Sequence, residues 1–234
     1  MKRLLAPLLA PVLLGALGMS GCAGPAFAAE EPVDAPAAKR IAKEGAGLRT
    51  AIFAGGCFWG VEGVFSHVKG VKSAVSGYHG GTAKNAKYSV VTTGMTNHAE
   101  SVKITYDPYE VRYDELLRIF FSVVADPTQL NRQGPDVGSH YRTAIVPTNE
   151  EQAAVARAYL AQLERAAIWD RPIVTRIEPQ RTFYPAEDYH QDFMAKNPRH
   201  GYILRWDRPK VEALKAMFPR DWRADFLRDG PPGA

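Results

Sequence analysis

The sequence is poor in cysteine, and its few histidines are not grouped. Only Cys22 and Cys57 occur among 234 residues, so disulfides cannot form the framework of the fold. None of the six histidines has the spacing to another histidine or cysteine that a zinc site requires. These shortages exclude a disulfide scaffold and argue against a zinc enzyme.

Strong charge of one sign is also missing. The net charge is +4 at pH 7, and because Lys2 and Arg3 are the only charged residues before Glu30, removing them leaves 4 − 2 = +2. No stripe of lysine and arginine alternates with aromatic residues, so nucleic acid is not an expected partner. A content of 46% hydrophobic and 23% charged residues is typical of one globular domain, with a monomer as the default expectation.

Beyond the N-terminus there is no long apolar run. Residues 4–19 form such a run behind a short basic head, with small residues after it, which predicts a secretory signal over residues 1–28. The sequence Ala-Phe-Ala at 26–28 fits cleavage by signal peptidase. The residues up to Cys22 equally resemble a lipoprotein signal, which would leave a lipid anchor on Cys22. Both alternatives predict a periplasmic or cell-envelope protein whose one free cysteine is Cys57.

The rest of the chain divides into a linker and one domain. Residues 29–47 are rich in alanine, proline and charge without periodicity, which predicts a flexible linker. Residues 48–234 follow the order β-α-β-β-α-β through Val146, which predicts an α+β, ferredoxin-like split βαβ sandwich with a mixed sheet. Long loops at 77–97 and 126–140 and a C-terminal helical extension complete the predicted domain. The expected helices lie near 57–69, 116–124, 148–167, 187–194 and 209–218.

The stretch AIFAGGCFWGVEGVF at 51–65 is the first candidate site. It reads as a buried strand, a turn at Gly55 and Gly56, and a helix that starts at Cys57. A helix N-terminus favours a thiolate, and the thiolate is the nucleophilic form of cysteine. Cys57 is therefore a candidate nucleophile, although a buried structural cysteine is a common alternative.

The two long loops and the strand starts beside them add further candidates. Glu100 begins an alternating strand, Asp136 and Tyr141 precede another, and Tyr88 follows a glycine-rich turn. Each residue alone has an ordinary structural explanation as a turn cap or a packed tyrosine. Because long ordered loops commonly carry function, we expect these groups to meet at the sheet edge that holds Cys57.

Five motifs follow one another between Phe53 and Tyr202. They are GGCFWG, GYHGG, NHAESVKITYDP, DPTQLNRQGPDVGSHYR and AEDYHQDF. In order and spacing they resemble the peptide methionine sulfoxide reductase A family, whose fold is also a ferredoxin-like α+β sandwich. The resemblance implies thiol-dependent reduction of methionine S-sulfoxide, free or in proteins, without a metal or organic cofactor.

The resemblance also implies a role for each candidate. Cys57 would take the oxygen of the sulfoxide and become a sulfenic acid, while Glu100 would protonate that oxygen through a raised pKa. The implied substrate-binding set holds the methyl group and the oxygen, and consists of Phe58, Trp59, Tyr88, Asp136 and Tyr141.

The chain departs from the family in the second half of the reaction. Many members carry resolving cysteines near the C-terminus, but here Ile203 stands where one could be and no cysteine follows Cys57. Asn97 and His140 also replace residues that are more frequent in the family. A single-cysteine enzyme would need an outside reductant, either a small thiol or a thioredoxin-like partner.

Three alternatives remain open at this stage. A thiol peroxidase would need only a reactive Cys57, and a Cys-His acyl-transfer enzyme would need a histidine base such as His98 or His140. A secreted module that binds methionine or its sulfoxide without turnover would keep the aromatic residues and tolerate loss of the thiol. Neither histidine would explain Glu100 or the tyrosines, and peroxide consumption by the purified protein would identify a peroxidase.

Overall fold

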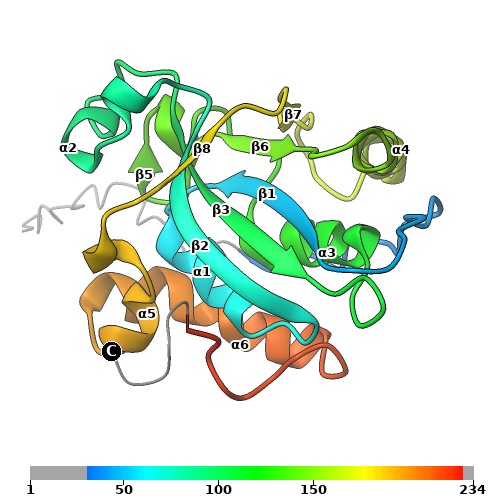
Figure 1. The fold of residues 1–234 in the computed structure, drawn as a ribbon. Helices are drawn as coiled ribbons and strands as arrows, with labels where there is room; N and C mark the ends of the chain where they lie inside the picture. Colours follow the sequence, from blue (N-terminus) through cyan, green and yellow to red (C-terminus); the bar gives the residue numbers. More distant parts are fainter. Residues whose placement is uncertain (1–30, 229–234) are drawn as a thin grey trace, which may run out of the picture.

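The structure of the protein is a computed structural model that describes residues 31–228, built around a six-stranded sheet (Figure 1). The predicted signal over 1–28 and its alternative cleavage at Cys22 lie outside these residues. No helix within residues 31–228 is long and apolar enough to cross a bilayer. The sheet has the order β7-β6-β1-β3-β2-β8. Its strands are β1 (Arg49–Gly55), β2 (Val71–His79), β3 (Ala99–Tyr106), β6 (Thr143–Val146), β7 (Arg176–Ile177) and β8 (Phe183–Pro185).

The other elements are mostly short helices. A small two-stranded sheet joins β4 (Arg132–Gln133) to β5 (Asp136–Val137), and π-helical turns occupy Phe120–Val124 and Ile203–Asp207. The α-helices are α1 (Phe58–Ser66), α2 (Tyr88–Val91), α3 (Tyr113–Ile119), α4 (Glu150–Ala166), α5 (Phe193–Lys196) and α6 (Arg208–Met217).

The four central strands confirm the predicted split βαβ arrangement. β3 lies between β1 and β2 and is antiparallel to both, and β6 is antiparallel to the other edge of β1. β1 therefore ends, and β3 begins, at the same edge of the sheet. Both long loops leave from this edge, which confirms the expectation that they return to the position of Cys57.

Aromatic packing holds α1 and α3 on one face of the sheet. The Phe53 ring of β1 lies 5.5 Å from the Phe65 ring of α1 and 6.0 Å from the Tyr113 ring of α3, between ring centroids. It also lies 5.1 Å from Phe120, in the π-helical turn that continues α3. Each of these side chains is at most 1% exposed, so their burial is a main apolar contribution to stability.

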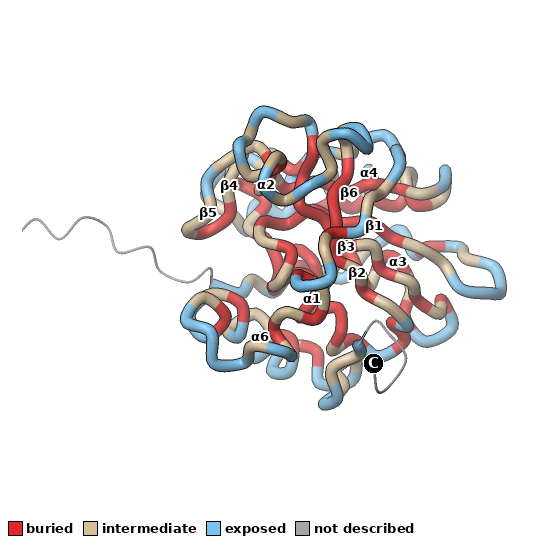
Figure 2. Tube along the Cα trace, turned by 60° about the vertical axis from the view of Figure 1, so that its left-hand side comes forward, coloured by how far each residue is buried: buried red, intermediate tan, exposed pale blue. Residues whose placement is uncertain are grey.

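Helix α1 is enclosed on all sides. Apart from Trp59, each of its residues is buried. Figure 2 shows this helix in red at the centre of the molecule, and Figure 1 shows α5 and α6 on the side away from the sheet. The approach of the C-terminal elements requires a glycine at position 60, because a Cβ there would lie 2.4 Å from Oδ1 of Asp207. The C-terminal extension thus forms part of the wall around the start of α1.

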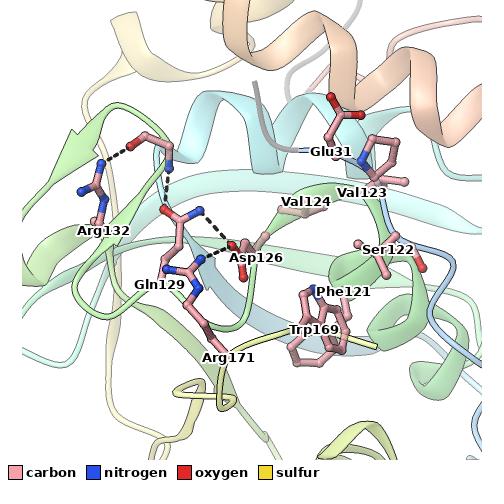
Figure 3. Close-up of a pocket in the computed structure, with 14 residues that line it drawn as sticks. Glu31, Phe121, Ser122, Val123, Val124, Asp126, Gln129, Arg132, Trp169 and Arg171 are labelled. Atoms are coloured by element: carbon pink, nitrogen blue, oxygen red, sulfur yellow. Dashed lines mark hydrogen bonds and ion pairs between the residues drawn. The ribbon is translucent and has the colours of Figure 1, made fainter. Parts of the chain in front are cut away.

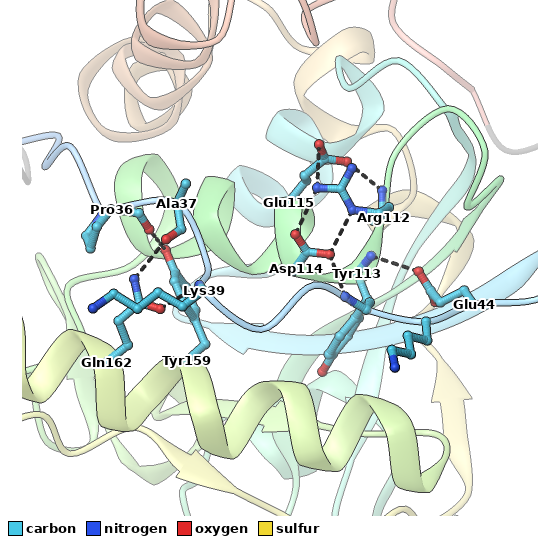
Figure 4. A network of polar contacts seen from close by, with 12 residues as sticks. Pro36, Ala37, Lys39, Glu44, Arg112, Tyr113, Asp114, Glu115, Tyr159 and Gln162 are labelled. Carbon is cyan, nitrogen blue, oxygen red and sulfur yellow. Dashed lines mark hydrogen bonds and ion pairs between the residues drawn. The ribbon is translucent and has the colours of Figure 1, made fainter.

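Residues 31–47 have no helix or strand but are not a free linker. They lie along α3 and α4 in a network of polar contacts (Figure 4). The Ala42 N–H donates to Oδ1 of Asp114 over 3.0 Å, and a Glu44 oxygen accepts from the Tyr113 N–H over 3.0 Å. Because buried polar groups without partners are costly, these paired contacts fix the segment on the domain. The prediction of flexibility is therefore wrong for this stretch.

Two local predictions also need correction. The helix expected over 148–167 is α4 at Glu150–Ala166, capped by Asn149, whose side chain accepts from the Gln152 N–H over 2.9 Å. The helix expected over 187–194 is a 3-10 turn at Asp188–His190 followed by the short α5. The turn is held by side-chain contacts to distant strands, which periodicity along the chain does not encode.

Candidate active site

Cys57 stands directly before the first residue of α1, as the sequence predicts. The preceding turn depends on Gly56, which has φ +87° and whose missing Cβ would lie 2.5 Å from Cβ of Gln133. Such a backbone conformation favours glycine, and no side chain has room there. The turn therefore brings the chain close to the loop that carries Gln133 and directs Cys57 to the sheet edge.

Glu100 lies beside the nucleophile. It is the second residue of β3, paired in register with Tyr78 of β2, and it is 1% exposed. Its Oε2 accepts a hydrogen bond from the backbone N–H of Phe58 over 3.1 Å. Burial raises the pKa of Glu100 to about 8, and although the Phe58 hydrogen bond opposes this shift, the charges of Asp136 and Asp207 support it. The carboxyl group is therefore mainly protonated at neutral pH.

The Cys57 thiol behaves differently from the expectation for a helix N-terminus. Burial raises the pKa of Cys57 well above its usual value, and the negative charges of Glu100, Asp207 and Asp136 act in the same direction. The backbone N–H of Trp59 lowers the pKa, but this contribution is smaller. The predicted stabilisation of a thiolate is thus outweighed by desolvation, and the resting group is a thiol.

Tyr88 and Tyr141 reach the same point from different loops. Tyr88 is the first residue of α2, and Tyr141 ends a 3-10 turn at the start of β6. Burial raises the pKa of both phenols, for Tyr88 to about 12, and the charges of Glu100 and Cys57 act on each of them. Both hydroxyl groups remain protonated and available as donors beside the thiol and the acid.

Asp136 is hydrogen-bonded to a tyrosine outside the predicted substrate-binding set. Its Oδ2 accepts a hydrogen bond from the hydroxyl of Tyr202, which the sequence did not single out. The charge of Cys57 contributes to the raised pKa of Tyr202, so this tyrosine also lies close to the thiol. Burial is the main cause of that shift.

Four aromatic side chains pack together next to Cys57 and form an aromatic wall, which consists of Phe58, Trp59, His190 and Phe193. Trp59 stacks on Phe193 of α5 with ring centroids 3.7 Å apart, and its Nε1 donates to Nδ1 of His190 over 3.1 Å. The His190 ring lies 4.9 Å from that of Phe58 and 4.4 Å from that of Tyr88. Trp59 is partly exposed, whereas Phe58 is 1% exposed and supports the wall from behind.

Glu187 joins this wall to the tyrosines. Its carboxylate accepts from the Tyr78 hydroxyl over 2.8 Å and from the backbone N–H of Tyr88 over 2.9 Å. The motif that contains Glu187 and His190 was noted in the sequence, but no role was assigned to either residue. They orient Tyr88 and Trp59, and only their contacts across the fold show this.

The loop between the π-helical turn and β4 is fixed by its own polar network. The Gln133 side chain accepts from the Asp126 N–H over 3.1 Å and donates to the Asp126 carbonyl over 2.8 Å. The Asp126 carboxylate accepts from Gln129 and Arg171 at 3.1 and 3.2 Å (Figure 3). This network holds Gln133 against Gly56 and forms one side of a pocket that also contains Phe121, Val124 and Trp169.

The thiol itself borders a small cavity whose far side comes from the C-terminal elements. This cavity is lined by Cys57, Asp136, Tyr202, Trp206, Asp207 and Lys210, together with the loop at 133–135. Within residues 31–228 no group of three or more histidine, cysteine, aspartate or glutamate residues could hold a metal ion. The site consists of a thiol, a protonated acid and several hydroxyl donors against an aromatic wall.

Comparison with known proteins agrees with this geometry. The family model described as peptide methionine sulfoxide reductase matches residues 49–221. The chain belongs to the peptide methionine sulfoxide reductase A family. It is 57% identical to peptide methionine sulfoxide reductase MsrA 2 of Mesorhizobium japonicum, over 76% of this chain and 91% of that protein. It is 48% identical to the Deinococcus radiodurans MsrA, over 74% and 84% of the two chains.

A solved structure of the family has the same fold. Methionine sulfoxide reductase A of Corynebacterium diphtheriae is 32% identical, with a TM-score of 0.55 over 75% of this chain and 86% of that one. The predicted α+β class is thereby confirmed. Ile203, which stands where the resemblance leads us to look for a resolving cysteine, is 1% exposed.

The raised pKa of Glu100 predicts a pH-dependent stability. The unfolded carboxyl titrates near 4.5 and the folded one near 8, so the folded protein binds the extra proton between these values. The free energy of unfolding should therefore fall as pH rises from about 4.5 to about 8, by at most about 1.4 kcal/mol per pH unit. Glu100→Gln should lack this fall, and urea unfolding at several pH values measures it.

The matched control is Glu164→Gln, which changes an exposed carboxylate on α4. Its stability curve should run parallel to that of the original protein. Parallel curves for Glu100→Gln as well would contradict the raised pKa.

Proposed function

We propose that this oxidoreductase converts methionine S-sulfoxide to methionine at Cys57 and is then restored by an external thiol. Reduction of methionine sulfoxide follows from its family and from its close relatives. The observation that supports the residue roles is the Glu100 carboxyl, buried and bonded to the first N–H of α1, next to the thiol. A protonated acid beside a sulfur nucleophile is what this reaction requires.

In the first stage the Cys57 sulfur attacks the sulfoxide sulfur. Glu100 gives its proton to the sulfoxide oxygen and recovers one from the thiol, while Tyr88 and Tyr141 donate hydrogen bonds to that oxygen. The attack forms an S–S bond. The oxygen then passes from the substrate sulfur to Cys57, so the substrate S–O bond and the S–S bond break, an S–O bond forms on Cys57, and methionine leaves. The products are methionine and a Cys57 sulfenic acid, so methionine is reduced and the cysteine is oxidised by two electrons.

The aromatic wall supplies the binding energy for the methyl group. Trp59 presents its partly exposed ring, held by Phe193 and His190, while the buried Phe58 fixes the position of the wall. Asp136 acts through the hydroxyl of Tyr202. The open sheet edge, formed by loops, is compatible with both free methionine sulfoxide and oxidised protein segments as substrates.

In the second stage an outside thiol reduces the sulfenic acid. No cysteine follows Cys57 in the sequence, and the sulfur of Cys57 is the one free thiol in the described part of the chain. A small thiol or a thioredoxin-like protein would form a mixed disulfide with Cys57, and a second thiol would release the reduced enzyme.

A single-turnover experiment tests the first stage. Reduced protein is mixed with one equivalent of methionine S-sulfoxide, or of the R form, without added reductant. We expect one methionine per protein and loss of the thiol with the S form alone. Methionine is counted by chromatography and the thiol by alkylation and mass spectrometry. If neither form yields methionine, the proposal is wrong. Consumption of peroxide would then indicate a thiol peroxidase, and binding of the sulfoxide without turnover would indicate a binding module.

Glu100→Gln tests the acid. The amide keeps an oxygen that can accept from the Phe58 N–H but has no proton to give, so we expect methionine formation to slow by about 10²-fold or more. The thiol should remain open to alkylation. The original protein should lose activity in the first stage as pH rises above about 8, and the variant should not show this loss. An unchanged rate in the variant would show that the acid is another group.

We also propose that the protein acts in the periplasm or cell envelope. The support is the basic head, apolar run and small residues of the first 28 positions. Mass spectrometry of the protein isolated from its cells should find an N-terminus at Ala29, or a lipid-modified Cys22. An intact N-terminus at Met1 would refute export by either route.

A further inference from the structure

Asp207 is a buried carboxylate beside Cys57 to which the proposed first stage assigns no proton transfer. It is 2% exposed and lines the small cavity that Cys57 borders. Its Oδ1 lies over Gly60 in the first turn of α1, as the 2.4 Å distance to a Cβ at that position shows. Its charge raises the pKa of Cys57 and of Glu100, which agrees with a position near both groups.

The position of Asp207 is not explained by helix capping. It is the residue before α6, where an aspartate side chain commonly accepts from the backbone of the new helix. Here the side chain makes no such hydrogen bond, and the backbone is already helical because α6 continues the π-helical turn. The carboxylate points instead toward α1 and the cavity. Burying a carboxylate has a cost that an exposed position at this helix start would avoid.

The cavity measures about 10 Å³, room for one water molecule, so a second sulfur would approach Cys57 at its mouth, where two neighbours suit a thiol. Lys210, one turn further along α6, lines the same cavity, and its ammonium donates to the Val124 carbonyl over 2.7 Å. The partly buried Trp206 adds an apolar surface. A carboxylate that can accept a proton, a cation that stabilises a thiolate and an aromatic flank therefore meet beside Cys57. The cavity adjoins the aromatic wall, because the ring of Tyr202, which lines it, lies 5.9 Å from the Trp59 ring.

We propose that the external thiol attacks oxidised Cys57 from the mouth of this cavity, with Asp207 as the base for that step. The inference rests on the proposed function, since it needs the sulfenic acid. Asp207 takes the proton of the incoming thiol, and the thiol sulfur forms an S–S bond with Cys57. The S–O bond of the sulfenic acid breaks, and Glu100 gives its proton to the leaving hydroxide, which becomes water. The incoming sulfur is oxidised and Cys57 is reduced to a mixed disulfide.

The packing of the C-terminal segment explains why the cavity would receive a thiol from another molecule. In relatives with a resolving cysteine, the second thiol belongs to the same chain. Here Ile203 and Leu214 are buried at 1% and 0% exposure, so the segment is packed as a wall. Asp207 and Lys210 lie on this packed segment and line the cavity, where they would assist a thiol from another molecule. Dithiothreitol and a thioredoxin share this chemistry and serve as the two probes.

The test separates the two stages with Asp207→Asn. Full-length protein is oxidised with one equivalent of methionine S-sulfoxide, freed from product, and mixed with dithiothreitol or reduced thioredoxin. The sulfenic acid that remains at each time is labelled with dimedone and counted by mass spectrometry. We expect one methionine per protein as in the original enzyme, but reduction of the sulfenic acid about 10²-fold slower with both probes.

A pH profile distinguishes a base from a structural residue. Without Asp207 only the thiolate of the probe can attack, so the rate for the variant should rise about tenfold per pH unit below the pKa of the probe. The original enzyme should show a shallower rise. The matched control is Glu212→Gln, an exposed carboxylate on the same helix, which should leave both stages unchanged. Lys210→Met is a second variant, expected to slow the second stage alone without steepening the profile.

Each outcome decides between the proposals. If the sulfenic acids of Asp207→Asn and Lys210→Met are reduced at the rate of the original enzyme, with the same dependence on pH, the cavity has no role in the second stage. A folded Asp207→Asn protein that forms no methionine would also overturn it, because Asp207 would then act in the first stage. Slowing with thioredoxin alone would show a docking contact instead of a base. If the original enzyme forms no methionine, the proposed function fails, and the inference fails with it.

Discussion

The hydrogen bond from the Phe58 N–H to Glu100 joins the two parts of the fold that the chemistry requires. It connects the first turn of α1 to the start of β3, 42 residues later in the chain, over 3.1 Å. Because the glycine turn fixes where α1 begins, this one contact places the thiol beside the acid. It also takes the place of water on a carboxyl group that has lost its hydration. The geometry of the site therefore follows from how β1, β3 and α1 pack together.

Burial then sets the protonation of both groups. Desolvation favours the uncharged form of an acid and of a thiol, so one physical cause keeps a proton on Glu100 and on Cys57. The acid is ready to protonate an oxygen at neutral pH. In the proposed first stage, the sulfur of Cys57 attacks as that oxygen accepts the proton. Neutral Tyr88 and Tyr141 complete the surroundings of the thiol and the acid, and the negative charges of Asp136 and Asp207 help to keep both groups protonated.

Much of the fold could be predicted from the sequence because its signals are local. The apolar alternation of β3, the glycines before Cys57 and the helical period of α1 each act within a few residues, and their order identified the split βαβ sheet. The candidate residues Cys57 and Glu100 do lie together in the structure, since both belong to regular elements whose ends meet at one sheet edge.

The contributions from the C-terminal half were not predictable in the same way. Tyr202 and Asp207 reach the thiol only because α6 and its preceding turn pack over α1, and no periodicity specifies that contact. Glu187 and His190 act through hydrogen bonds to Tyr88 and Trp59 across more than 90 residues of sequence. The pKa of Cys57 was misjudged because the helix end is visible in the sequence, whereas the loss of water around the sulfur is not.

The raised pKa of Cys57 also decides which oxidants the protein can meet safely. Peroxides react with thiolates, and further oxidation to sulfinic and sulfonic acids would destroy the one free thiol within residues 31–228. A cysteine that stays protonated until Glu100 activates a bound sulfoxide reacts slowly with peroxide in solution. The burial of α1 thus keeps Cys57 protonated and unreactive until a suitable substrate is bound, in addition to limiting which molecules can reach the thiol.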